Sequence, residues 1–249
     1  MEKIDYLVWR RDGLTIEEHR DQLLDEVAPA ILTVGPTELT IHTADTDQDI
    51  PTPTLLMGRG ADLAAVVTLW LDSIDDRAPI TAALDAVGSS VDAYLVTESM
   101  PQRRDDRDWP DGEPSPGITH FTCFPKPSRL SADEFYRGWH EVHTPASFRL
   151  HPRRWEYVRD AVVRPLTGGS PPLGAIVLER FRTVEDYADP SLLYGPPETM
   201  EETMRDLPLY ADVEDITSRP LHEHILRSRG APEAAAAGPN APSGPAPVP

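Results

Sequence analysis

Two histidines one helical turn apart, His140 and His143, stand beside a tryptophan in the segment EFYRGWHEVHTPA, residues 134–146. An imidazole that is partly removed from water can shift its pKa from about 6.5 to either side of neutrality. A general acid or base that works near pH 7 requires such a pKa. The segment therefore indicates proton transfer by His143. The alternative is a helix-end histidine that stabilises the helix dipole by about 0.3–1 kcal/mol.

Two stripes run along the helix expected over residues 132–143. The apolar stripe has the i, i+4, i+7 spacing of a face that packs on a sheet, and it comprises Phe135, Trp139 and Val142. The adjoining stripe comprises Tyr136, His140 and His143. We expect Phe135 and Trp139 to form the apolar wall of a pocket, with His143 at its border and His140 turned more toward solvent.

A third histidine, His120, lies in the predicted strand ITHFTCF, on the alternate face from Phe121 and Cys123. If its face lines the pocket, His120 comes within reach of His143. If it lines a barrel interior instead, it is a hydrogen-bonded core histidine. Cys123 is the single cysteine, which excludes an internal disulfide and indicates a small buried thiol.

Two further side chains could contribute to a site. Tyr157, in the predicted strand WEYVRDAVV, could orient a substrate oxygen through its phenol, or simply pack in the sheet. Glu179 follows the apolar run of the predicted strand LGAIVLERF and is a candidate pocket residue. Alternatively, Glu179 and Arg180 form a surface pair of little energetic weight.

Motifs for metals and nucleotides are not found. His140 with His143 gives H-x-x-H, and His222 with His224 gives H-x-H, but neither is the HExxH motif of a zinc enzyme. The sequence has no phosphate-binding glycine loop and no GxSxG elbow. We therefore expect no metal and no cofactor.

The charge balance limits the class of partner. The 249 residues contain 23 Lys and Arg against 42 Asp and Glu, a net charge of −19 that repels nucleic acids and anionic membranes. No stretch approaches the roughly 20 apolar residues of a membrane span, and the first residues are too charged for a signal peptide. These features predict a soluble cytoplasmic protein whose partner is a small molecule.

The elements around these residues occur twice in the same order. Strand patterns in the first half cover residues 3–11, 38–45, 63–71 and 91–98, and helices are expected over 16–27 and 73–88. Thr15 with Glu18 forms a capping box, and Pro29 is expected to end the first helix. The second half repeats this βαββαβ order, with Ser131 and Glu134 as the capping box and Pro145 as the stop.

This order predicts an α+β fold. Two ferredoxin-like βαββαβ repeats should pack sheet to sheet as a pseudo-dimeric α/β barrel. The predicted parts are an N-terminal repeat (1–100), a linker (101–117), a C-terminal repeat with the pocket (118–227) and a disordered Ala/Pro/Gly tail (228–249). Internal duplication favours a monomer with an internal pseudo-dimer, or a weak homo-oligomer.

The second half resembles the EthD family of the dimeric α/β-barrel superfamily. The family pattern of Trp, three residues and His-x-Pro fits Trp139, His143 and Pro145, and its Tyr-Val pair and its strand ending in Glu fit Tyr157–Val158 and Gly174–Glu179. The resemblance implies a pocket between sheet and helices, and cofactor-free cyclase, dehydratase, decarboxylase, isomerase or monooxygenase chemistry on small organic molecules. The first half departs from the pattern and is expected to be structural: Leu23, Leu24 and Val27 stand where Trp139, His140 and His143 stand in the second half.

These features together predict a cofactor-independent lyase, isomerase or cyclase, including dehydratase chemistry, that acts on a small hydrophobic substrate. His143 would move the proton, and Tyr157 or His120 would hold the oxygen that gains charge. A non-catalytic accessory protein that binds a small molecule is the alternative. A tandem barrel whose pocket is filled by side chains is a third possibility.

Overall fold

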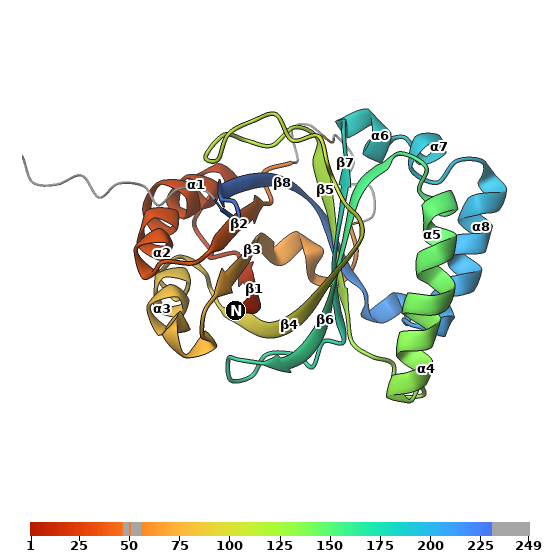
Figure 1. Cartoon of the computed structure of the whole chain (residues 1–249), viewed down its shortest axis with the longest axis horizontal. Coiled ribbons are helices and arrows are strands. Elements are labelled where there is room, and N and C mark those ends of the chain that lie inside the picture. Colours follow the sequence, from red (N-terminus) through yellow and green to blue (C-terminus); the bar gives the residue numbers. More distant parts are fainter. Residues whose placement is uncertain (47–49, 51–55, 231–249) are drawn as a thin grey trace, which may run out of the picture.

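Eight antiparallel strands close into one barrel in the computed structural model, which describes residues 1–46, 50 and 56–230 (Figure 1). The order around the barrel is β1-β3-β2-β8-β5-β7-β6-β4. The strands are β1 (Glu2–Trp9), β2 (Glu38–Thr43), β3 (Leu63–Leu71), β4 (Val91–Gln102), β5 (Ile118–Phe124), β6 (Arg154–Pro165), β7 (Ala175–Phe181) and β8 (Thr217–Arg227). The strands expected from sequence overlap all eight of these elements.

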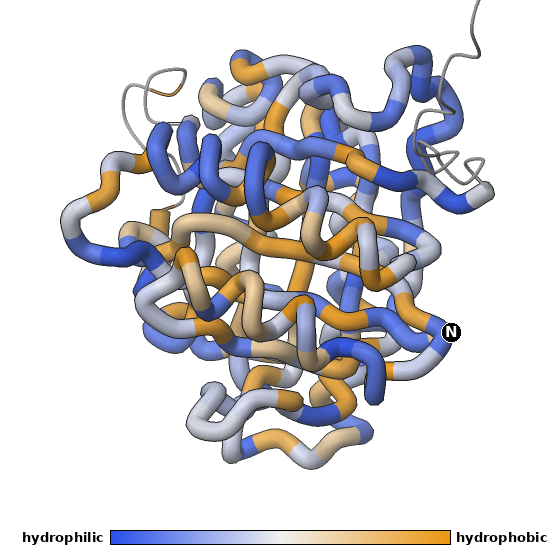
Figure 2. Tube along the Cα trace, turned by 90° about the vertical axis from the view of Figure 1, so that its left-hand side faces the viewer, coloured by the Kyte–Doolittle hydropathy of each residue, from blue (hydrophilic) through white to orange (hydrophobic). Residues whose placement is uncertain are grey.

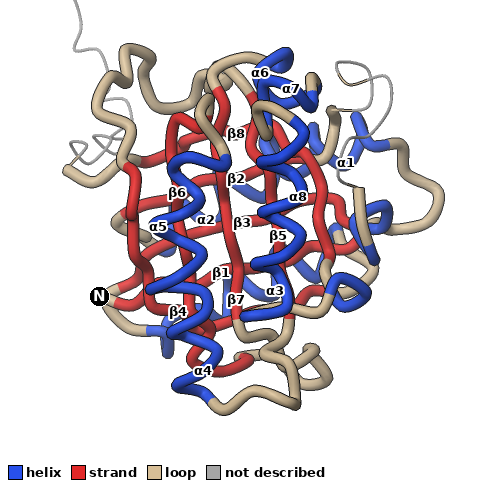
Figure 3. The backbone as a smooth tube through the Cα atoms, turned by 90° about the vertical axis from the view of Figure 1, so that its right-hand side faces the viewer, coloured by secondary structure: helices blue, strands red, loops and turns tan. Residues whose placement is uncertain are grey.

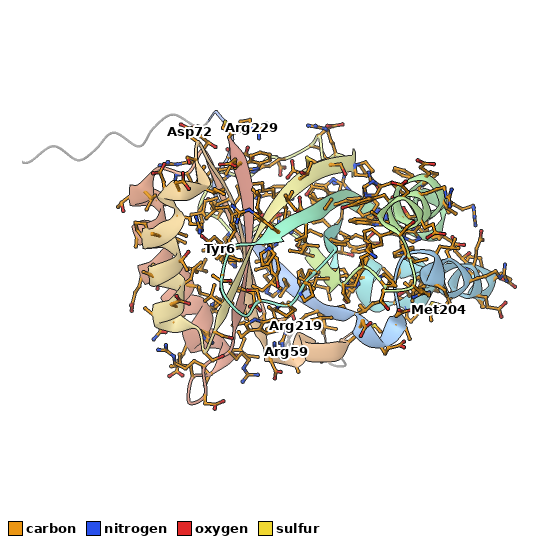
Figure 4. The ribbon with its side chains drawn as sticks, turned by 90° about the horizontal axis from the view of Figure 1, so that it is seen from below. Tyr6, Arg59, Asp72, Met204, Arg219 and Arg229 are labelled. Atoms are coloured by element: carbon orange, nitrogen blue, oxygen red, sulfur yellow. The ribbon has the colours of Figure 1, made fainter. Side chains whose placement is uncertain are left out.

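Helices form two layers on opposite sides of the barrel (Figure 1). The N-terminal half contributes α1 (Ile16–Gln22), η1 (Leu23–Val27), α2 (Ala28–Val34), η3 (Ile74–Arg77) and α3 (Ala78–Val87) to one layer. The short helix η2 (Gly58–Asp62), which carries Arg59, lies instead against β8, which carries Arg219 (Figure 4). The C-terminal half contributes α4 (Ala132–Tyr136), η4 (Arg137–His143), α5 (Thr144–Leu150), α6 (Val184–Ala188), α7 (Pro190–Leu193), α8 (Pro197–Asp206), η5 (Leu207–Leu209) and η6 (Val213–Asp215). None of the helices in the described part of the chain is long and apolar enough to cross a bilayer.

The predicted pair of ferredoxin-like sheets packed face to face is wrong. The edges of the two halves are hydrogen-bonded to each other instead, since β2 pairs with β8 and β4 pairs with β6, both antiparallel. Edge pairing satisfies the backbone N–H and C=O groups that an open sheet would leave exposed. These two strand pairings, β2 with β8 and β4 with β6, close the barrel. The predicted tail falls almost wholly on residues 231–249, outside the described residues.

Both halves contain the same helical arrangement, in which a capped α-helix continues through a π-helix into a second α-helix. The predicted capping boxes are confirmed, because the Thr15 and Ser131 side chains each accept from the N–H of the glutamate three residues later. Pro29 and Pro145, however, do not end their helices: each lies in the first turn of a further α-helix. The preceding π-helices, η1 and η4, bond i to i−5, and this wider turn accommodates a proline that lacks an N–H and would clash with the carbonyl at i−4.

The cores between the barrel and its two helical layers differ in composition. The N-terminal layer is filled by buried aliphatic side chains such as Leu23, Val27 and Ile31, which pack on the outer faces of β1 to β4. Figure 2 views this side of the molecule and shows hydrophobic and hydrophilic residues interleaved along the chain. Aromatic side chains such as Phe124, Trp139 and Tyr210 dominate the core beneath the C-terminal layer.

The lumen of the barrel is charged at one end. Lys3 on β1 is 4% exposed, and its Nζ donates to Glu98 at 2.7 Å and to Asp160 at 2.8 Å. Arg180 on β7 forms an ion pair with Glu223 on β8 at 3.3 Å. These groups are buried as pairs from different strands, which is the condition under which charges are tolerated inside proteins.

Candidate active site

A cavity of about 220 Å³ lies between the outer face of β5, β6 and β7 and the C-terminal helices. Figure 3 shows α5 and α8 side by side across these strands, and the two helices are joined by a bidentate Arg149–Glu202 pair. The wall is mostly apolar and aromatic, including Phe124, Trp139, Val177, Leu193, Met204, Leu207 and Ile216. The polar groups that line the cavity are His120, Thr122, His143, His151, Tyr157, Glu179, Tyr194, Thr203, Tyr210 and Ser218.

The π-helix η4 turns His143 into this cavity. Phe135, Trp139 and His143 lie four residues apart and are buried together, whereas Val142 is 44% exposed. The expected stripe of Phe135, Trp139 and Val142 is therefore wrong at its last position. It assumed 3.6 residues per turn, and the wider π turn replaces Val142 with His143 on the face that meets the sheet.

His143 is held as a buried, neutral imidazole. The residue is 8% exposed, and its Nδ1 has no hydrogen-bond partner among the residues that the structure describes. Burial lowers the pKa of His143 to about 4, although the Glu179 carboxylate opposes the shift. The ring lies 4.6 Å, centroid to centroid, from the ring of Tyr210. At pH 7 the imidazole is thus neutral, and one of its two ring nitrogens is unprotonated.

Two of the predicted site residues lie outside the cavity wall. His140 lies between Tyr136 and Trp139, with tilted ring contacts at centroid distances of 5.3 Å and 4.6 Å, and does not line the cavity. Burial, with the nearby Arg159 charge, lowers the pKa of His140 to about 4. Phe135 packs behind the wall against Phe124 and Trp139. Phe135 therefore supports the cavity without touching its contents.

His120 faces the cavity, but both of its ring nitrogens have hydrogen-bond partners. Its Nδ1 is 3.1 Å from the Tyr187 hydroxyl and its Nε2 is 3.0 Å from the Thr122 hydroxyl. Burial lowers the pKa of His120 to about 4. Of the alternatives for this residue, the structure places it on the pocket face, opposite Phe121 and Cys123, which point into the barrel.

A carboxylate is fixed at the inner wall of the cavity. Arg154, which the sequence analysis did not single out, donates from Nη1 to Glu179 Oε1 at 2.5 Å and from Nη2 to Ser147 at 3.0 Å. Burial alone would raise the pKa of Glu179, but Arg154 outweighs it and lowers this pKa to about 2. The guanidinium also lies 4.1 Å from the Tyr157 ring. Glu179 is therefore ionised, as part of a fixed pair.

The tyrosines of the cavity stay protonated at neutral pH. Burial raises the pKa of Tyr157, and it raises those of Tyr194 and Tyr210 further. The phenols of Tyr194 and Tyr210 can therefore donate hydrogen bonds to a ligand oxygen. A hydrogen bond with Thr144 partly offsets the rise in the pKa of Tyr157.

His151, Tyr194 and Tyr210 were missed by the sequence analysis. His151 lies 3.2 Å through Nδ1 from the Leu193 carbonyl, so Nδ1 carries the proton and Nε2 is the unprotonated nitrogen of the neutral ring. Tyr210 follows η5 and reaches His143 from a segment 67 positions later in the chain. No local spacing connects these residues to His143, although a histidine directly after the helix, in RLHPRRW, was a usable signal.

The metal-like spacings do not assemble a metal site in the described residues, where no group of three His, Cys, Asp or Glu is close enough to hold an ion. His222 and His224 lie on the outer face of β8, away from the cavity. His222 Nδ1 is 3.1 Å from Asp45 Oδ1, and His224 Nε2 is 3.2 Å from Thr43 Oγ1.

Gly138 holds η4 against the segment that carries Tyr210. A Cβ at Gly138 would fall inside the van der Waals radius of the Leu209 carbonyl oxygen. We expect Gly138→Ala to push η5 away from η4 and to weaken ligand binding in the cavity about tenfold or more, because Tyr210 moves with η5. The affinity is measured by adding ligand and following the quenching of tryptophan fluorescence. Gly168→Ala, where an added Cβ meets nothing within 4 Å, should bind like the wild type, and equal affinity of the two variants would contradict the close approach.

Acidification should destabilise the fold between about pH 6.5 and 4. Burial lowers the pKa values of His120 and His143 to about 4 and that of His42 to about 3. The unfolded chain binds protons at these histidines below about pH 6.5, whereas the folded chain does not. Stability is thus fully present above that pH and falls below it, by on the order of 1 kcal/mol per histidine per pH unit.

Urea denaturation measured at about pH 7.5, 6 and 5 should show this fall. The variant His42→Asn removes one of the three groups and should lower the slope of stability against pH. A slope that His42→Asn leaves unchanged would contradict a neutral, buried His42 in the folded state.

No protein-family model and no curated protein sequence matches the chain, so the resemblance to the EthD family is not confirmed. Solved structures do match. A protein described as anthrone oxidase-like has a TM-score of 0.58 and 14% identity, covering 95% of this chain and 96% of that one. A monooxygenase-like protein from Fusobacterium nucleatum has a TM-score of 0.50 and 6% identity, covering 91% of this chain and 92% of that one. At these identities the likeness shows the fold alone.

Proposed function

We propose that this protein is an enzyme that removes a proton from an acidic C–H group of a small, planar, largely hydrophobic molecule bound in the cavity beside His143. The observation that carries the proposal is a buried neutral imidazole, with Nδ1 unpartnered among the described residues, in the wall of an apolar cavity. A structural histidine would be expected to have its ring nitrogens bonded, as those of His120 are.

The surrounding groups suit proton abstraction from carbon. His143 would accept the proton, and the negative charge would then develop on an adjacent substrate oxygen. Tyr210, whose ring lies 4.6 Å from that of His143, supplies a protonated phenol as a donor for this oxygen. Glu179 would stabilise the imidazolium that forms, since its carboxylate already favours the charged state of His143. This extends the sequence prediction, in which Tyr157 or His120 held the oxygen.

Proton abstraction is the step that several reaction classes share. A carbanion or enolate can lose a leaving hydroxyl, be reprotonated elsewhere, close a ring or react with O₂. The lyase, isomerase or cyclase activity expected from the sequence is part of this proposal, and so is the EthD-like pattern around Trp139 and His143. The anthrone oxidase-like description of one structural neighbour adds oxidation by O₂ as a fourth outcome.

Deuterium exchange tests the shared step without knowledge of the final product. Anthrone is a suitable first probe because it is planar and has an acidic methylene group. The protein and anthrone are mixed in D₂O without oxygen, and loss of the methylene proton signal is followed by NMR. We expect exchange well above the rate in buffer. Oxygen uptake after admission of air then separates oxidation from the other outcomes.

The rival function is non-catalytic binding of a small molecule, which needs the cavity but not the titratable group. Val142→Ala is a matched control, because Val142 precedes His143 but is 44% exposed, and it should exchange like the wild type. If anthrone quenches tryptophan fluorescence saturably but exchanges no faster than in buffer, the binding function is favoured and the catalytic proposal fails for this class of ligand.

A further inference from the structure

The cavity has a pair of polar side chains at each end of α5. His143 is the N-cap residue of this helix and His151 is its C-cap residue. Eight residues at about 1.5 Å each place their Cα atoms about 12 Å apart, yet both side chains line the cavity. Each histidine has a tyrosine beside it, since the ring of Tyr210 lies 4.6 Å from that of His143 and the ring of Tyr194 lies 5.4 Å from that of His151. The reaction proposed above uses only the first pair.

His151 offers a hydrogen-bond acceptor to the cavity. Its Nδ1 donates to the Leu193 carbonyl oxygen at 3.2 Å, so Nε2 of the neutral ring carries the lone pair. Burial lowers the pKa of His151, which keeps the ring neutral at pH 7. Nε2 keeps accessible surface and has no hydrogen-bond partner among the described residues. A ligand in the cavity can therefore donate a hydrogen bond to this nitrogen.

Tyr194 offers a donor at the same end. It directly follows Leu193, so the bond that orients His151 also holds Tyr194 beside it. The residue is 8% exposed, and its hydroxyl has no hydrogen-bond partner in the part of the chain that the structure describes. Burial raises the pKa of Tyr194, so the phenol stays protonated at pH 7. A ligand oxygen near Tyr194 can therefore accept a hydrogen bond from it.

A hydroxyl group matches this pair, because it can donate to His151 Nε2 and accept from the Tyr194 phenol at the same time. A carboxylate cannot donate, and the ionised Glu179 in the cavity wall disfavours a second anion. We infer that His151 and Tyr194 bind a hydroxyl group of the ligand. If the proposed function holds, on which this last step rests, the substrate carries that hydroxyl at the end remote from the C–H group that His143 deprotonates.

Three ligands that differ in one substituent test the pair. 2-Naphthol can donate and accept, 2-methoxynaphthalene can only accept, and 2-methylnaphthalene can do neither. Each is titrated against the isotope-labelled full-length chain, and the NMR signals of the cavity residues report binding. We expect the affinity to fall about three- to tenfold at each step of this series, the effect of losing one neutral hydrogen bond. Equal affinities, or tighter binding of 2-naphthoate than of 2-naphthol, would overturn the inference.

Two variants assign the two hydrogen bonds to their residues. Tyr194→Phe removes a single oxygen, so 2-methoxynaphthalene should bind it no better than 2-methylnaphthalene. His151→Phe keeps a ring beside Tyr194 but removes both nitrogens, so 2-naphthol should bind it no better than 2-methoxynaphthalene. Tyr194→Phe remains a test if His151→Phe does not fold.

His143→Gln alters the other end of α5 and should keep the wild-type order of the three ligands. A preference for 2-naphthol that stays undiminished in Tyr194→Phe and His151→Phe, or that is lost in His143→Gln, would place the hydroxyl at the wrong end and overturn the inference.

The binding series and the exchange experiment fail separately. The expected order of affinities without deuterium exchange of anthrone would support the hydroxyl site and count against the proposed function. Exchange that depends on His143, together with equal affinities for the three naphthalenes, would overturn the hydroxyl site and leave the proposed function in place.

Discussion

His143→Gln is expected to lower the rate of proton abstraction by about 10²–10⁴, the contribution typical of a positioned general base. Glutamine keeps a polar side chain of similar size but cannot accept a proton at neutral pH. Ligand affinity should change little, because the wall of the cavity is mostly apolar and aromatic. Deuterium exchange of anthrone measures the rate, and fluorescence quenching measures the affinity.

His140→Gln is the matched control for this experiment. It is the same substitution on the same helix, three residues earlier, and the His140 ring packs at a tilt against Trp139 outside the cavity. We expect its exchange rate to stay within a few-fold of the wild type. Similar losses in both variants would show that the effect comes from the helix as a whole. An unchanged rate in His143→Gln would remove His143 from the reaction.

Lys3→Met should lower the free energy of unfolding by about 3–5 kcal/mol at pH 7, the cost of breaking a buried ion pair from one side. Asp160 is fully buried and Lys3 is its ion-pair partner at 2.8 Å, so the carboxylate is left without its counter-charge. This loss is a large fraction of the roughly 5–15 kcal/mol that stabilises a typical domain. Urea denaturation monitored by circular dichroism measures it.

The deficit of Lys3→Met should shrink as the pH falls. Burial raises the pKa of Asp160 even in the wild type, where the Lys3 charge opposes the shift, so loss of Lys3 raises it further. A folded pKa above the unfolded value contributes stability at low pH and loses it as the pH rises. The double variant Lys3→Met/Asp160→Asn should recover part of the loss. Arg149→Met removes a cation from an exposed pair and should change the free energy of unfolding far less than Lys3→Met.

Local patterns predicted the elements well. Thr15 with Glu18 and Ser131 with Glu134 were recognisable as capping boxes because both partners lie within four residues. The strands were recognisable because their β-branched and aromatic residues recur at short range. The repeat of this order in the second half identified the helix of His143 as the counterpart of the helix at residues 16–27.

Closure and the charged lumen could not be predicted in the same way. The alternation of Lys3 and Asp5 with Ile4 and Tyr6 marks two faces of β1, but not which face is enclosed. Lys3 finds its partners 95 and 157 positions away, at Glu98 and Asp160. Such pairs form because β4 and β6 are hydrogen-bonded to each other. The sequence pattern of neither strand indicates this pairing.

Several residues that the sequence analysis proposed for the site line one cavity in the structure, but the segment that carries Tyr210 was not predicted. His143, Trp139, Tyr157 and Glu179 line the cavity, and His120 lies on the same face. A 3.6-residue period placed Val142 on the helix face that meets the sheet, where the π turn places His143. The periodicity of apolar residues carries no information about a π-helix. Tyr210 follows η5, which lies directly against η4 at Gly138.

The protonation state of the His143 ring tests the central claim most directly. The imidazole signals of the labelled protein are followed by NMR from about pH 8 to 5.5, with and without anthrone, and His143→Gln assigns them. A buried neutral base predicts a ring that is still unprotonated at about pH 5.5 and that shifts when the ligand binds. A ring that titrates near pH 6.5 and does not respond to the ligand would contradict the account.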